Sequence, residues 1–172
     1  MVHVLDGADA FESFESFQCS PVIVLQPWMA MVQAVTTTAE LSAMAHAVEA
    51  ARYELEAFWY YRYAMSWLPY GEVSSISFAL DWLKAMAQSL QRASWHWHQA
   101  QQWLTKYGEA HKAALYRPLL TQGSAQHERV TQVGIEVRRQ VARLCQQWHL
   151  AIPDWFDDPC ARDESTESGV NA

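Results

Sequence analysis

Residues 75–107 constrain the fold more than any other part of the chain, because apolar side chains recur there every three or four positions. The series holds for ten positions: Ile76, Ala79, Leu83, Met86, Leu90, Ala93, Trp97, Ala100, Leu104 and Tyr107. This period matches an α-helix with one buried face, whereas a half-buried strand would alternate every second residue. The spacing predicts one long helix with a seam, a row of apolar residues on its buried face. We expect Gly108 to end this helix in a left-handed conformation.

A second long helix is predicted to begin at Thr37 and to stop at Pro69 and Gly71. Thr37 followed by Glu40 has the spacing of a capping box, in which both side chains satisfy backbone N–H groups at a helix start. The predicted seam again alternates steps of three and four: Leu41, Met44, Val48, Ala51, Leu55, Phe58, Arg62 and Met65. Because Arg62 is the one charge in this series, we expect it to meet a carboxylate or to stack on a ring.

The third long helix is predicted to begin at Ser124, a suitable N-cap, and to end at Pro153. Its predicted seam is Val130, Gly134, Val137, Val141, Leu144 and Trp148. Gly134 within this series indicates that another helix approaches closely at that point. Shorter elements complete the pattern: helices over 10–17, 27–35 and 109–120, the last broken near Pro118, and an extended segment over 20–27.

These patterns predict an all-α protein, an antiparallel helical bundle of three long helices with heptad-like seams plus shorter packed helices. Residues 1–159 are expected to form a single helical-bundle domain, since a chain of 172 residues suits one hydrophobic core. Residues 160–172 are small, polar and acidic, which predicts a flexible tail with nothing to bury.

The charges are unevenly distributed along the chain. The formal net charge is −7, yet residues 84–143 carry nine Lys and Arg against three Glu. This basic middle is either neutralised within the protein or available to a polyanion, and the sequence leaves both readings open.

The cysteines and the N-terminus bear on the compartment in which the protein works. Cys19, Cys145 and Cys160 are odd in number and lack a CxxC spacing, which argues against a disulfide framework or a structural zinc site. The start of the chain lacks the basic and apolar regions of a signal peptide, and no apolar run approaches the roughly 20 residues of a membrane span. We therefore expect a cytoplasmic protein without a membrane partner.

The end of the second predicted helix is aromatic on nearly every side, and it supplies the main candidate for a protein-interaction site. A helix that is apolar all round is either covered on every side or presents an interface, and the sequence leaves both open. The candidate interaction residues are Tyr53, Trp59, Tyr60, Tyr63 and Trp67.

A second candidate is a surface that binds RNA or DNA through its phosphate backbone. Basic, amide and exposed aromatic side chains opposite a helix seam suit such binding, although they also suit an ordinary solvated surface. The candidate residues are Arg92, Trp95, Lys106, Arg139 and Arg143.

Sequence motifs for catalysis, metal binding and cofactor binding are absent. The chain contains no ExxH pair for a metal site in a bundle, no GxSxG, and no glycine-rich phosphate loop. His46 and Glu49 are expected on the solvent side of their helix. His96 and His98 would point about 200° apart, so they could not ligate one ion together. We expect no catalytic residues, metal or cofactor.

The favoured hypothesis is a non-enzymatic helical interaction protein that acts as a subunit or adaptor of a larger assembly, with a protein partner. A helical subunit that binds RNA or DNA through the basic 84–143 region is the first alternative. An enzyme with a site that carries no recognisable motif is the second. The sequence leaves a homo-oligomer open.

Overall fold

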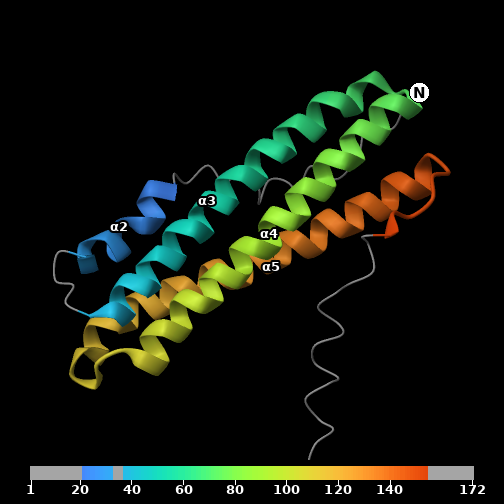
Figure 1. The fold of residues 1–172 in the computed structure, drawn as a ribbon. Helices are drawn as coiled ribbons and strands as arrows, with labels where there is room; N and C mark the ends of the chain where they lie inside the picture. Colours follow the sequence, from blue (N-terminus) through green and yellow to red (C-terminus); the bar gives the residue numbers. More distant parts are fainter. Residues whose placement is uncertain (1–20, 33–36, 155–172) are drawn as a thin grey trace, which may run out of the picture.

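A computed structural model describes residues 21–32 and 37–154, and every regular element in these ranges is helical. The elements are α2 (Pro21–Val32), α3 (Thr38–Trp67), η2 (Leu68–Tyr70), α4 (Val73–Tyr107), η3 (Ala110–Lys112) and α5 (Ala113–Gln147). Helices α3 and α4 form an antiparallel hairpin, α5 returns along α4, and α2 lies beside the first half of α3 (Figure 1). The predicted all-α bundle of three long helices is therefore confirmed.

The bundle has two ends that differ in construction. At the closed end, α2, the start of α3, the end of α4 and the start of α5 come together around the Trp28 and Trp97 rings, whose centroids lie 6.0 Å apart. At the open end, the described helices are only the last turns of α3, the first turns of α4 and the last turns of α5 (Figure 1). Trp28 and Trp97 are fully buried.

The seam predicted for α4 is confirmed at nine of its ten positions, from Ile76 to Leu104, all of which are buried. Tyr107, the last member, is instead 55% exposed because it lies at the final turn of the helix. A long uninterrupted series fixes the buried face reliably, since each turn repeats the same choice.

The seam predicted for α3 is wrong by one residue at most of its positions, although Ala51 is buried as predicted. The buried series is Ala43, Ala47, Ala50, Glu54, Ala57, Tyr61 and Ala64, which is the predicted series shifted one position toward the N-terminus. Leu41, Val48, Leu55 and Arg62 are exposed instead. Because the distance between packed helices depends on the side chains at the contact, a row of alanines lets α3 lie close to its neighbours.

Three predicted helix boundaries, at Pro27, Pro118 and Ser124, are wrong. Helix α2 runs through Pro27 and includes residues 21–26, which were predicted to be extended. Helix α5 runs through Pro118 and Ser124 without a break. Pro118 is the sixth residue of α5. The hydrogen bond that it cannot donate would go to the Ala114 carbonyl in the first turn, so only that carbonyl loses its helical partner. Ser124 donates to Gln101 Oε1 (2.7 Å) rather than capping a helix.

Glycines mark the turns, although not all as predicted. Gly71 follows η2 with φ +64° and ends the first arm of the hairpin, as expected. Gly108 has φ −70° and ψ 154°, so the predicted left-handed cap is wrong. A Cβ atom at Gly108 would lie 2.2 Å from the Leu104 carbonyl oxygen, which explains the glycine. The close approach predicted at Gly134 is also wrong, because nothing lies within 4 Å of a Cβ placed there.

Several predictions concern residues outside the described ranges. They are the helix over 10–17, the acidic tail over 160–172, and the states of Cys19 and Cys160. The third cysteine, Cys145, is a buried free thiol, and burial raises its pKa.

Candidate functional site

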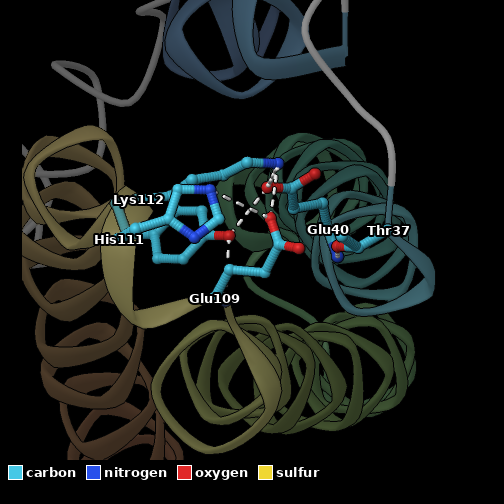
Figure 2. A network of polar contacts seen from close by, with 6 residues as sticks. Thr37, Glu40, Glu109, His111 and Lys112 are labelled. Carbon is cyan, nitrogen blue, oxygen red and sulfur yellow. Dashed lines mark hydrogen bonds and ion pairs between the residues drawn. The ribbon is translucent and has the colours of Figure 1, made fainter.

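The closed end is held by a polar network that joins α3 to η3 and α5 (Figure 2). The Thr37 hydroxyl accepts a hydrogen bond from the Glu40 backbone N–H (3.3 Å), which confirms half of the predicted capping box. The Glu40 carboxylate is only 1% exposed and accepts from Tyr116 Oη (2.7 Å) and Lys112 Nζ (2.9 Å). Lys112 also pairs with Glu109 (2.9 Å), and the two carboxylates raise the pKa of its ammonium group. The charged groups of this network are paired with one another, so we interpret it as a structural contact that holds the three elements together.

A second carboxyl group lies in the core between α3 and α4. Glu54 accepts a hydrogen bond from the Trp97 indole N–H. Burial raises the pKa of Glu54 to about 7, an effect that the Trp97 hydrogen bond and Arg129 partly oppose. Glu54 replaces the apolar residue predicted at this level of the α3 seam. Its burial separates it from any substrate in solution.

Five exposed rings lie at the open end of the hairpin, and we call them together the aromatic face. Its members are Trp59, Tyr63 and Trp67 of α3, Tyr70 of η2, and Phe78 of α4. Between 37% and 68% of each of these side chains is exposed. Large rings this exposed, clustered on one surface, are unusual for a surface that meets only water.

The helical repeat places these rings in register. Trp59, Tyr63 and Trp67 are spaced four residues apart, so they form one stripe along α3. Trp67 meets Phe78 of α4 with ring centroids 5.1 Å apart, and Tyr63 meets Trp82 of α4 at 5.0 Å. Contacts with these two α4 rings therefore hold Tyr63 and Trp67 in defined positions, which reduces the entropy lost when a partner binds.

Two predicted interaction residues, Tyr53 and Tyr60, do not belong to the aromatic face. Both are half-buried, and each contacts a ring of α4. Tyr60 stacks on Trp82 (5.7 Å) and donates to Glu56 (3.4 Å). Burial, followed by the charge of Glu56, raises the pKa of the Tyr60 phenol. Tyr60 thus packs on Trp82, which in turn contacts Tyr63 of the aromatic face.

Tyr53 belongs to a separate cluster near the middle of the hairpin. Its ring stacks on His96 (5.5 Å), and the guanidinium groups of Arg52 and Arg92 lie 4.0 and 5.6 Å from its centroid. Trp95, 54% exposed, meets His96 edge-on (4.8 Å). The structure therefore brings together Tyr53, predicted for a protein partner, with Arg92 and Trp95, predicted for nucleic acid.

The contact between two histidines in this cluster was not predicted from the sequence. His46 Nδ1 and His96 Nδ1 are 2.9 Å apart, and one donates to the other. Burial lowers the pKa of both rings, which favours the neutral forms that such a bond needs. The two residues are 50 positions apart, so no local spacing could have indicated the contact.

The remaining basic candidates do not join this cluster. Lys106 lies over the ring of Tyr107 (5.2 Å) near the end of α4. Arg139 pairs with Glu136 (3.5 Å) on α5, and Arg143 is exposed on the same helix. The predicted nucleic-acid residues are therefore divided between the hairpin and α5.

One polar cluster has the residue types of a nucleophile and a base, but not their geometry. His127 Nδ1 lies 3.1 Å from Ser94 Oγ and 3.0 Å from the Ser94 carbonyl oxygen. Because a carbonyl only accepts, its bond requires a proton on Nδ1, and that nitrogen cannot then take the Ser94 proton.

Within residues 21–32 and 37–154, no group of three or more His, Cys, Asp or Glu is arranged to hold a metal ion. None of the described helices is sufficiently long and apolar to cross a bilayer.

No protein-family model, curated protein or solved structure matches this chain.

Proposed function

We propose that this chain is a non-enzymatic helical interaction protein, acting in the cytoplasm as a subunit or adaptor of a larger assembly, and that it binds a protein partner through the aromatic face. The observation that carries the proposal is the row of exposed Trp59, Tyr63 and Trp67 rings, of which Tyr63 and Trp67 contact rings of α4. Tryptophan and tyrosine dominate the residues that contribute most to protein association. Water alone would favour polar side chains at these positions.

The test is affinity capture with the purified chain and a triple variant, Trp59→Gln, Tyr63→Gln and Trp67→Gln. The three side chains are exposed or nearly so, and the variant should retain its helix content by circular dichroism. A matched control replaces Leu41, Leu115 and Ile135 by Gln, because these apolar residues are also 40% to 51% exposed but lie outside the aromatic face. We expect the triple variant to lose a partner that the control retains. Equal recovery by all three proteins would contradict the proposal.

A second candidate function is binding of RNA or DNA by the cluster around Tyr53. The supporting observation is that Arg52 and Arg92 flank one ring while Trp95 is exposed beside them. Arginines neutralise phosphates, and an exposed ring can stack on a base. If this is the function, Arg92→Glu should weaken binding in a gel shift and reduce its salt dependence, whereas Arg139→Glu should have a smaller effect. A parent protein without any shift at low salt would exclude it.

A further inference from the structure

A groove separates α3 from α5, and α4 forms its floor. Both helices pack along α4 but make few contacts with each other. In the closed half of the bundle α2 fills this groove, because it contacts α3 and α5 and its Trp28 ring reaches Trp97 of α4. A Cβ atom at Gly123 of α5 would lie 3.5 Å from the Trp28 ring. No described helix fills the open half of the groove (Figure 1).

The side chains that point into the open half are nevertheless covered. Gln140 follows Thr131 by nine residues, or about two and a half turns, so the two point to opposite sides of α5. Thr131 bonds to Ser94 of α4 (3.1 Å), and Gln140 points away from that contact, yet it is only 3% exposed. On α3, Phe58 points away from Tyr60, which stacks on α4, and is half-buried. A buried amide on a side that no described helix covers indicates that another part of the chain lies there.

The chain that precedes α2 joins the fold beside this open half. Trp28 and Glu54 lie at one level of the bundle, since Trp97 contacts both. Helices α2 and α3 run antiparallel (Figure 1). Pro21, seven residues before Trp28, therefore lies about 10 Å nearer the open end. Residues 1–20 lie outside the described ranges, and Pro21 fixes where they join the groove.

These residues have the length and the apolar pattern to fill the open half. From Glu54 to the end of α3 at Trp67 the groove is about 20 Å long, and a helix of 20 residues spans about 30 Å. Phenylalanines recur every third position where the sequence predicts a helix over 10–17, so their rings share one side of it. They are Phe11, Phe14 and Phe17. The groove offers partly buried apolar side chains to these rings: Phe58, Met65 and Val133.

The charges of the segment and of the groove are complementary. Residues 1–20 carry four acidic side chains and no Lys or Arg. Arg129 lies on the α3-facing side of α5, close enough to Glu54 to oppose the rise in pKa that burial gives this carboxyl. Arg62 on α3 and Arg143 on α5 are exposed at the margins of the open half. An acidic segment in the groove therefore lies beside three arginines.

We propose that residues 1–20 dock in the open half of this groove, continuing the line of α2, with their three phenylalanine rings against α3 and α5. The acidic side chains of the segment then neutralise part of the basic middle. The segment does not cover the aromatic face, because Trp67 follows Phe58 by nine residues and so points to the opposite side of α3. The inference goes beyond the proposed function and does not depend on it.

Photo-cross-linking of the full chain tests the docking. Replacing Phe14 by p-benzoylphenylalanine should give cross-links within one molecule to both walls of the groove, near Phe58 of α3 and near Val133 of α5, as located by mass spectrometry. The same probe in place of Ser16, on the opposite side of the predicted helix, is the control and should give fewer of these products. Cross-links only between molecules, only to the aromatic face, or no more abundant than in the control overturn the proposal.

A triple variant of the segment, Phe11→Gln, Phe14→Gln and Phe17→Gln, tests whether the groove opens. We expect hydroxyl-radical oxidation of Phe58 and Met65 to rise about threefold or more, because the groove is then open to water. Trp67, on the opposite side of α3, should keep the rate of the parent, which distinguishes undocking from general unfolding. Unchanged oxidation of Phe58 and Met65 overturns the proposal. The cross-linking result holds whether or not this variant folds.

Discussion

The closed and open ends of this bundle use the same residue types for opposite purposes. At the closed end, Trp28 and Trp97 are fully buried against each other, and Glu40 fastens three elements together. At the open end, Trp59 and Trp67 remain exposed on the hairpin. The difference shows that aromatic content alone does not distinguish a core from an interface. What decides is whether another helix covers the rings.

The largest expected difference between the two ends is in the loss of stability caused by replacing a tryptophan with alanine. Trp97→Ala removes a fully buried ring and should lower the free energy of unfolding by about 3–5 kcal/mol. Trp67→Ala removes a ring that is 37% exposed and contacts Tyr70 and Phe78, and we expect a smaller loss of about 1–2 kcal/mol. Urea unfolding of the dilute proteins measures both. Equal losses would show that the open end is a core like the closed end.

The buried Glu54 should make stability fall as the pH rises. Its pKa in the folded protein is about 7, above the 4.5 of an exposed glutamic acid, so the folded state favours the protonated form. Its contribution is greatest below pH 4.5 and is lost as the pH rises through 7. Glu54→Gln keeps an acceptor for Trp97 without the charge, and at pH 8 it should raise the free energy of unfolding by up to about 3 kcal/mol. A variant less stable than the parent at pH 8 would contradict this account.

Glu40→Gln tests how much the polar network at the closed end contributes to stability. The change weakens the hydrogen bonds from Tyr116 and Lys112 to a fully buried group, and we expect a loss of about 1–3 kcal/mol. Glu49→Gln is the control, since Glu49 is 44% exposed and pairs only with Arg52 among its described ion pairs. The control should stay within about 0.5 kcal/mol of the parent. Thermal unfolding of the two variants gives the comparison.

The smallest expected effect concerns His46 and His96, between the two ends. Because the pKa of each is lowered in the folded protein, their contribution is present above pH 6.5 and is lost as the pH falls through the folded values. Replacing both by Gln should flatten the dependence of melting temperature on pH between 7 and 5. Glu49, Arg52, Tyr53, Arg92 and Trp95 surround the pair and are left unchanged in this experiment. An unaltered pH profile would show that the pair does not titrate as described.

The sequence predicted the α4 seam because its apolar side chains are large and regular. The α3 prediction is wrong because Leu41, Val48 and Leu55 are more hydrophobic than the alanines beside them, and hydrophobicity alone does not decide which residues are buried. Close helix packing selects small side chains instead, which rotated the buried face by one residue.

The candidate site was predictable only in part. The four-residue spacing of Trp59, Tyr63 and Trp67 is visible along the chain and indicates one stripe. The contribution of Phe78 and the contact between His46 and His96 depend on how α3 and α4 align, and no local pattern encodes that alignment. For the same reason, the meeting of Tyr53 with Arg92 could not be predicted.

Hydroxyl-radical footprinting of the protein alone and in complex with a partner recovered by affinity capture tests the central claim most directly, that the aromatic face is the association surface. We expect Trp59, Tyr63, Trp67, Tyr70 and Phe78 to become protected from oxidation in the complex. Tyr107, which is 55% exposed near the closed end, should remain equally reactive throughout. Unchanged reactivity of the five rings, or protection of Tyr107 in their place, would contradict the account.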